Sequence, residues 1–141
     1  MGLDNGILLK IHNKINFDDW EIIPDYITVE FDEFYTNEYK DGYYYEVCYW
    51  RKYWGLRNDV MRDLRFKDKG DGRYEIEKVD DLKTIIKDIE YYFENPDEWQ
   101  CPVWTIDEAA GNLARTIINL SWLCKYKEQN PSAKIIFYDS Y

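Results

Sequence analysis

The segment YYYEVCYWRKYWGLRNDVMRDL, residues 43–64, combines two hydrophobic periods. Residues 43–50 are β-formers throughout, and alternation predicts one face made by Tyr45, Val47 and Tyr49, with Glu46 on the other. From residue 52 onward the apolar positions recur every three or four residues, which predicts a one-faced helix. These helical positions are Tyr53, Leu56, Val60 and Leu64. A strand that leads directly into a helix indicates a fold of mixed class.

The same patterns recur on both sides of this segment. Strands are predicted at residues 7–11, 26–31, 73–77 and 135–138, and helices from residue 80 to 95 and from 105 to 129. The first and last strands are apolar on both faces, which is typical of central strands. The sequence therefore predicts an α+β fold, with a mostly antiparallel sheet of about five strands and about three helices packed on it. Without a repeat or linker, residues 1–141 are predicted to form a single domain.

Acidic side chains outnumber basic ones and are unevenly distributed. The formal net charge is −10; residues 1–50 carry 3 basic and 11 acidic side chains, whereas residues 51–69 carry 7 basic and 3 acidic ones. Such a negative protein repels nucleic-acid backbones, so we expect no direct nucleic-acid binding and favour a partner with a basic surface. Aromatic residues make up 18% of the chain, so we expect many rings at the surface. Exposed rings of this kind are compatible with a homo-oligomer.

The sequence contains no recognisable catalytic, metal-binding or targeting motif. Cys48, Cys101 and Cys124 are widely spaced, with His12 as the one imidazole, which favours reduced thiols over a disulfide framework or a zinc site. Glycine-rich phosphate loops and the motifs of common hydrolases do not occur. The sequence also lacks a membrane-spanning apolar run and a secretory signal. We therefore expect a cytoplasmic protein that is not an enzyme and requires neither a metal nor a cofactor.

One predicted site lies where the strand ending at Trp50 leads into the helix. Arginine and lysine beside a helix N-terminus suit phosphate or carboxylate groups. If that strand pairs with the last strand of the chain, residues near the C-terminus join the site. The predicted small-anion site consists of Trp50, Arg51, Lys52, Tyr138 and Ser140. The basic ridge of residues 51–65 that follows is either part of a site or neutralises the acidic loops of residues 16–41.

A second predicted site is the acidic, aromatic loop that follows residue 31. Its proposed partner-binding residues are Asp32, Glu33, Tyr35, Glu38 and Asp41. Carboxylates spaced along rigid rings can imitate a nucleic-acid backbone or engage the basic groove of a nucleic-acid-handling enzyme. The alternative is an ordinary hairpin with solvated charges and cross-strand aromatic pairs.

Three stretches of the chain resemble the landmarks of one protein family. They are Met1-Gly2-Leu3-Asp4, Glu46-Val47-Cys48-Tyr49-Trp50-Arg51-Lys52 and Phe137-Tyr138-Asp139-Ser140-Tyr141. A family of small phage and prophage proteins without an assigned activity begins Met-Gly-Leu-Asp, carries Glu-Val-Gly-Tyr-Trp-Arg-Lys before a helix, and tends to end Tyr-x-Ser-Ser-Trp. This chain departs from that pattern at Cys48, Trp54, Arg57 and Tyr141. The resemblance implies a viral or mobile-element origin and a bacterial host, but no particular activity.

Two functions remain open from the sequence. The first is an accessory protein that inhibits a host nucleic-acid-handling or defence protein through its acidic surface. The second is a protein that binds a small ligand, a nucleotide or signalling molecule, through the region of Trp50, Arg51 and Lys52.

Overall fold

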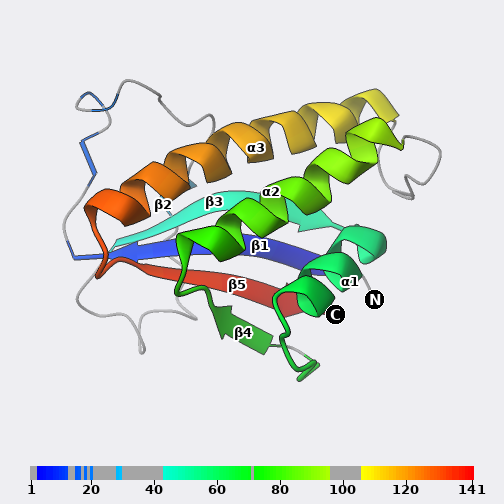
Figure 1. Ribbon diagram of the computed structural model, residues 1–141, viewed down its shortest axis with the longest axis horizontal. Coiled ribbons are helices and arrows are strands. Elements are labelled where there is room, and N and C mark those ends of the chain that lie inside the picture. Colours follow the sequence, from blue (N-terminus) through cyan, green and yellow to red (C-terminus); the bar gives the residue numbers. More distant parts are fainter. Residues whose placement is uncertain are drawn as a thin grey trace.

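A computed structural model describes residues 3–12, 15–16, 18, 20, 28–29, 43–70, 72–95 and 106–141 as a sheet packed against helices (Figure 1). The strands are β1 (Asp4–Ile11), β2 (Thr28–Val29), β3 (Tyr43–Arg51), β4 (Gly72–Glu75) and β5 (Lys134–Ser140). The helices are α1 (Trp54–Asp63), α2 (Val79–Glu94) and α3 (Ile106–Gln129). The α+β class and the three helices that the sequence predicts are confirmed.

The sheet has the strand order β2-β3-β1-β5-β4, and every pair of neighbours is antiparallel. Four of these strands have at least four residues, whereas β2 contributes only two. Within the described residues the sheet therefore has four strands of four or more residues, and not the predicted number of about five. β1 and β5 are inner strands of the sheet. Both are apolar on both faces, as is typical of strands whose two faces are buried.

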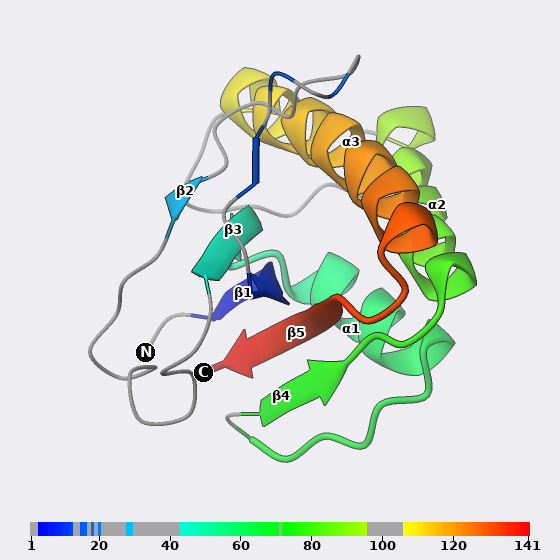
Figure 2. The ribbon, with the colours of Figure 1, turned by 90° about the vertical axis from the view of Figure 1, so that its left-hand side faces the viewer.

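All three helices pack on one face of the sheet (Figure 2). The main core lies between them, where the apolar stripe of α2 meets odd-numbered residues of β1 and β5 such as Ile7 and Phe137. On the opposite face, Leu8, Tyr44 and Ile136 form a smaller buried cluster, with Tyr138 packed against it. Successive residues of a strand point to opposite faces, so each inner strand contributes to both clusters.

A β-bulge in β3 changes which of its residues face the helices. The register with β1 shifts between Ile7 and Leu8, which leaves Val47 as the extra residue. Beyond the bulge Cys48 and Trp50 belong to the main core, whereas Tyr49 faces the other way and its hydroxyl donates to Asp4 Oδ1. The prediction that Tyr49 shares a face with Tyr45 and Val47 is therefore wrong, because one inserted residue reverses the alternation.

Among the described helices, none is both long enough and apolar enough to cross a membrane. Cys101 lies outside the described residues. The loop residues Asp32, Glu33, Tyr35, Glu38 and Asp41, the predicted partner-binding set, also lie outside them.

Candidate functional site

The described residues of the three stretches that resemble the phage family lie on or beside β1, β3 and β5 and reach the same end of the sheet. In the strand register Asp4 lies opposite both Arg51 of β3 and Ser140 of β5, and Asn5 lies opposite both Trp50 and Asp139. β1 therefore separates β3 from β5. The predicted pairing of the strand ending at Trp50 with the last strand is wrong, because the apolar first strand occupies the place between them.

The five predicted anion-binding residues do not line one cavity. Trp50 is fully buried on the helix side, whereas Tyr138 packs on the opposite face of the sheet. Arg51 and Ser140 are exposed and flank Asp4 from its two sides. Lys52 leaves the strand with φ of 60°, and its backbone N–H donates to Leu3 O at 2.8 Å. The sheet thus distributes these side chains over both faces and its edge.

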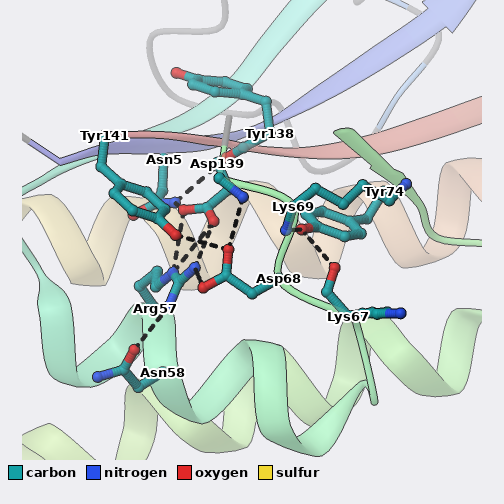
Figure 3. A network of polar contacts seen from close by, with 11 residues as sticks. Asn5, Arg57, Asn58, Lys67, Asp68, Lys69, Tyr74, Tyr138, Asp139 and Tyr141 are labelled. Carbon is teal, nitrogen blue, oxygen red and sulfur yellow. Dashed lines mark hydrogen bonds and ion pairs between the residues drawn. The ribbon is translucent and has the colours of Figure 1, made fainter. Parts of the chain in front are cut away.

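A buried polar network centred on Arg57 lies on the helix side of this end (Figure 3). Arg57 Nε and Nη2 donate to the two carboxylate oxygens of Asp139 at 3.1 and 2.7 Å, and Nη2 also reaches Asp68 Oδ2 at 2.8 Å. Nη1 donates to Asn58 Oδ1 at 3.0 Å, and Asn5 Nδ2 donates to Asp139 Oδ1 at 2.7 Å. All three guanidinium nitrogens are therefore engaged by the protein, which makes this network structural.

The charges in the network stabilise one another. The hydrogen bond that Arg57 donates to Asp139 is the main cause that raises the pKa of Arg57, and the hydrogen bond to the Asp68 carboxylate adds to it. In return, the Arg57 hydrogen bond and that of Tyr141 lower the pKa of Asp68 to about 2. The exposed ring of Tyr141 covers the guanidinium, with its centroid 5.0 Å from Arg57 Cζ. A charge removed from water to this degree needs such partners.

The basic ridge of residues 51–65 is partly neutralised within α1 itself. Arg62, whose side chain is 69% exposed, contacts Asp63 at 2.9 Å and Asp59 at 3.4 Å. Arg57 points inward to the buried network. In the described part of the chain, two members of the ridge thus serve to balance charge locally. Most of the acidic loop region 16–41 lies outside the described residues, so its pairing with the ridge stays a prediction.

A polar cavity of about 450 Å³ lies between β3 and the first half of α3, and we call it the β3–α3 cavity. On the helix side it is lined by side chains spaced three or four residues apart, which places them on one face. These are Asn112, Arg115, Thr116 and Asn119. On the strand side it is lined by Glu46, Val47, Cys48 and Tyr49, so the cavity lies directly beside the bulge.

Hydrogen bonds fix the polar groups on the inner wall of the β3–α3 cavity. Asn119 Nδ2 donates to Val47 O at 2.9 Å, and this carbonyl belongs to the bulged residue. The indole N–H of Trp50 lies 3.4 Å from Thr116 Oγ1, and the Tyr53 hydroxyl lies 3.4 Å from Asn112 Oδ1. Trp50 thus supports the wall of the cavity from behind.

Comparison of the chain with family models, curated proteins and solved structures gave no match.

The thiol of Cys48 is held in its neutral form. Burial is the main cause that raises the pKa of Cys48, and the nearby Glu46 carboxylate raises it further. A thiolate, and not a thiol, is the nucleophile and the metal ligand. Among the described residues, no three histidine, cysteine or acidic side chains are grouped closely enough to hold a metal ion.

Sequence reasoning missed both the buried network and the β3–α3 cavity. The apolar positions of the last helix, Leu113, Ile117, Leu120 and Cys124, recur at helical spacing and predict the face that packs inward. A polar stripe of Asn112, Thr116 and Asn119 runs beside that apolar stripe with the same spacing, and Thr116 and Asn119 are buried. Three small polar side chains at helical spacing next to an apolar face are a signal that the sequence does carry. The pairing of Arg57 with Asp139, 82 residues away, leaves no local signal.

Proposed function

We propose that the protein acts by binding, and that it receives a small polar ligand of about nucleotide size in the β3–α3 cavity. The observation that carries this proposal is the cavity itself, with amide, hydroxyl and guanidinium groups gathered on one face of α3. Its volume of about 450 Å³ falls in the range of about 300–1,000 Å³ that is usual for small-molecule sites.

The lining indicates which ligand chemistry fits. Arg115 is exposed at the cavity and its planar guanidinium suits a phosphate or carboxylate group. Among the described residues, the Asn112 amide nitrogen has no hydrogen-bond acceptor, so it is available to an acceptor on a ligand. Glu46 also lies among the residues that line the cavity on the β3 side. An anionic ligand with further hydrogen-bond acceptors, such as a mononucleotide, matches Arg115 and Asn112.

The inner wall of the cavity is polar and is held in place by β3. Thr116 and Asn119 are 2% and 4% exposed; Thr116 accepts from the Trp50 indole, and Asn119 donates to Val47 O. The neutral Cys48 thiol offers no activated nucleophile. We therefore propose a binding protein and not an enzyme.

A nucleotide panel tests this proposal by thermal unfolding and calorimetry. A ligand that binds only the folded protein raises the melting temperature with its concentration. Arg115→Gln should weaken that ligand at least about tenfold, because a charge-assisted hydrogen bond contributes about 1.5–3 kcal/mol. Arg62→Gln, which removes a charge on α1 away from the cavity, serves as the matched control and should leave affinity unchanged.

Arg51→Ala distinguishes the two places where a ligand has been predicted. If Arg51→Ala abolishes the thermal shift and Arg115→Gln does not, the ligand binds at the end of β3 and the β3–α3 cavity is not the site. If no nucleotide raises the melting temperature, the small-ligand proposal fails.

The second candidate is an accessory protein of phage or mobile-element type that inhibits a host nucleic-acid-handling or defence protein. The net charge of −10 favours it, because long-range attraction speeds association with a basic partner. Its proposed contact residues are those of the acidic loop, Asp32, Glu33, Tyr35, Glu38 and Asp41.

Affinity capture from a bacterial lysate, followed by mass spectrometry, tests this candidate. A variant with Asp32→Asn, Glu33→Gln, Glu38→Gln and Asp41→Asn should lose the captured partner, and salt should weaken the complex. The control carries Glu75→Gln, Glu77→Gln, Glu90→Gln and Glu94→Gln, which remove the same charge from exposed positions elsewhere. An affinity that does not change with salt concentration, or that both variants lower equally, would contradict a specific role for the loop.

A further inference from the structure

The strand β4 forms one edge of the sheet. It is the last strand in the order β2-β3-β1-β5-β4, and on one side it pairs with β5 (Figure 1). No described residue forms a backbone–backbone hydrogen bond with its other side. An edge strand of this kind is a template on which another strand can pair. The side chains of β4 then determine which strand fits.

The hydrogen bonds to β5 show which residues of β4 face the open edge. Directly after the strand, Ile76 N–H donates to Ile135 O at 2.8 Å. Along an antiparallel pair, every second residue directs its backbone groups to the neighbouring strand. Tyr74, two residues before Ile76, therefore points its N–H and C=O groups to β5. Arg73 and Glu75 point their backbone N–H and C=O groups to the open edge.

The edge strand is held in place through Tyr74. This residue is 6% exposed and belongs to the main core on the helix side of the sheet. Its ring stacks on that of Phe66 with the centroids 4.7 Å apart, and its hydroxyl donates to Lys67 O at 2.9 Å. Arg73 and Glu75 point to the opposite face, where both are exposed. The edge is therefore preformed, so that pairing with another strand costs little additional ordering.

The charges of β4 have the order that suits pairing with a second copy of the same strand. Two antiparallel copies related by a two-fold axis can pair the outward-pointing residues in three registers. Arg73 lies opposite Arg73 in the first, and Glu75 lies opposite Glu75 in the second. In the third register the axis passes beside Tyr74, and Arg73 of each copy lies opposite Glu75 of the other. This register alone places opposite charges at both positions, whereas like charges directly opposite each other are destabilising.

Both charged side chains can take part in such a pair. In the described part of the chain, Glu75 forms no ion pair, so its carboxylate is available to a cation of another molecule. Arg73 already has an interaction within its own chain. A guanidinium has five N–H donors, so one such interaction does not prevent it from also binding a carboxylate.

From this register we propose that β4 is a self-association surface, at which two copies of the chain pair edge to edge about a two-fold axis beside Tyr74. Backbone hydrogen bonds and an ion pair then join residue 73 of each copy to residue 75 of the other. The strand is short and each copy has a net charge of −10, so we expect a weak dimer that forms at high protein concentration. This surface is separate from the β3–α3 cavity and from the acidic loop, and it does not depend on the proposed function.

Sedimentation equilibrium of the full chain, from micromolar to millimolar concentration at physiological salt, tests the proposal. The natural protein should form dimers as its concentration rises. Arg73→Glu places carboxylates opposite each other, and Glu75→Arg places guanidinium groups opposite each other. Each variant should lower the dimerisation affinity about tenfold or more, because two pairs change from attraction to repulsion. The double variant Arg73→Glu/Glu75→Arg restores opposite charges and should dimerise like the natural protein.

An equimolar mixture of the two single variants gives the sharpest test of the register. In a dimer of Arg73→Glu with Glu75→Arg, each residue 73 again lies opposite a residue 75 of opposite charge. The mixture should therefore show a higher average mass than either variant alone. Lys87→Glu and Glu90→Arg on α2 make the same changes in net charge at exposed positions and should dimerise like the natural protein.

Three outcomes would overturn the proposal. A natural protein that remains monomeric at millimolar concentration does not self-associate through β4. Dimers that Arg73→Glu and Glu75→Arg leave unchanged form through another surface. A mixture of these two variants that forms no heterodimer excludes the register with the axis beside Tyr74, even if each variant alone is monomeric.

Discussion

At the scale of single residues, Arg57 shows how much one side chain can contribute to this fold. Its side chain is 9% exposed and its partner Asp139 is completely buried. The guanidinium joins α1 to β5, and Asp139 also accepts from Asn5 of β1. An ion pair buried in this way need not exceed a hydrophobic pair in stability, but removing one partner leaves an uncompensated buried charge.

Asp139→Asn should therefore destabilise the protein strongly. The buried Arg57 would lose its main countercharge, and we expect the free energy of unfolding to fall by about 3–5 kcal/mol, measured by urea unfolding. Asp63→Asn removes a partner of the exposed Arg62 and should cost less than about 1 kcal/mol. A loss of similar size in both variants would contradict a special role for the buried pair.

Asp88 of α2 should make stability depend on pH. Burial first, then a hydrogen bond with Asp63 and the charges of Asp63 and Asp59, raise the pKa of Asp88 from 3.8 to about 7. The folded protein therefore binds this proton more tightly than the unfolded chain does. The free energy of unfolding should accordingly fall as pH rises from about 4 through about 7.

The asparagine introduced by Asp88→Asn carries no charge at any pH. The substitution should therefore raise the free energy of unfolding above pH 7 and change it little at pH 4. We expect a gain of about 1–2 kcal/mol at pH 8, after allowance for screening of this partly exposed carboxyl group. Urea unfolding at pH 4, 6 and 8 measures it. Glu90→Gln, an exposed change on the same helix, is the control. A gain from Asp88→Asn that is the same at every pH would disprove the mechanism.

At the scale of elements, the close approach of strands around Gly6 requires a residue without a side chain. A Cβ added at Gly6 would lie 2.5 Å from Cys48 O and 2.6 Å from the Tyr138 ring. The first of these atoms is backbone next to the bulge, so it cannot move without disturbing the β1–β3 pairing. The bulge and the packing of Tyr138 thus both depend on this glycine.

Gly6→Ala should destabilise the protein by about 2 kcal/mol or more, because overpacking forces strands apart. Gly111→Ala in α3 makes the same chemical change where a Cβ meets nothing closer than 3.9 Å. That variant should instead gain about 0.5–1 kcal/mol, because alanine favours the helix. Denaturant unfolding of the two variants gives the comparison. Equal changes in the free energy of unfolding would show that steric overlap at Gly6 does not determine stability.

The elements themselves were largely readable from the sequence, whereas their neighbours in space were not. The helical stripe around Leu82 and Ile85 predicts α2, and both residues are fully buried. The spacing of apolar residues within a strand contains no information about which strands are neighbours. The position of β1 between β3 and β5 therefore could not be derived from the sequence. The bulge at Val47 arises from one inserted residue, which alternation cannot reveal. For this reason the predicted anion site was divided between two faces.

At the scale of the whole molecule, charge separates regions of different chemistry. The molecule has a net charge of −10, yet residues 51–69 carry 7 basic and 3 acidic side chains. The β3–α3 cavity contains both Arg115 and Glu46. A negative molecule repels free anions at long range, so an anionic ligand must gain its affinity from close contacts inside such cavities.

The net charge should also make the folded state more stable in moderate salt. The formal net charge of the chain is −10, and the mutual repulsion of excess like charges is greater in the compact state than in the unfolded chain. Salt screens this repulsion, whereas the buried Arg57–Asp139 pair is screened much less. The free energy of unfolding should therefore rise between 0.01 and about 0.2 M NaCl.

Urea unfolding across this salt range provides the measurement, and the variant with four Glu→Gln changes at positions 75, 77, 90 and 94 provides the internal comparison. It removes four negative charges and takes the formal net charge from −10 to −6. Its stability should consequently depend less on salt. If salt lowers the free energy of unfolding of the natural protein, exposed ion pairs such as Arg62–Asp63 outweigh the general repulsion. In that case the negative charge would not oppose folding, and partner binding would be its remaining physical consequence.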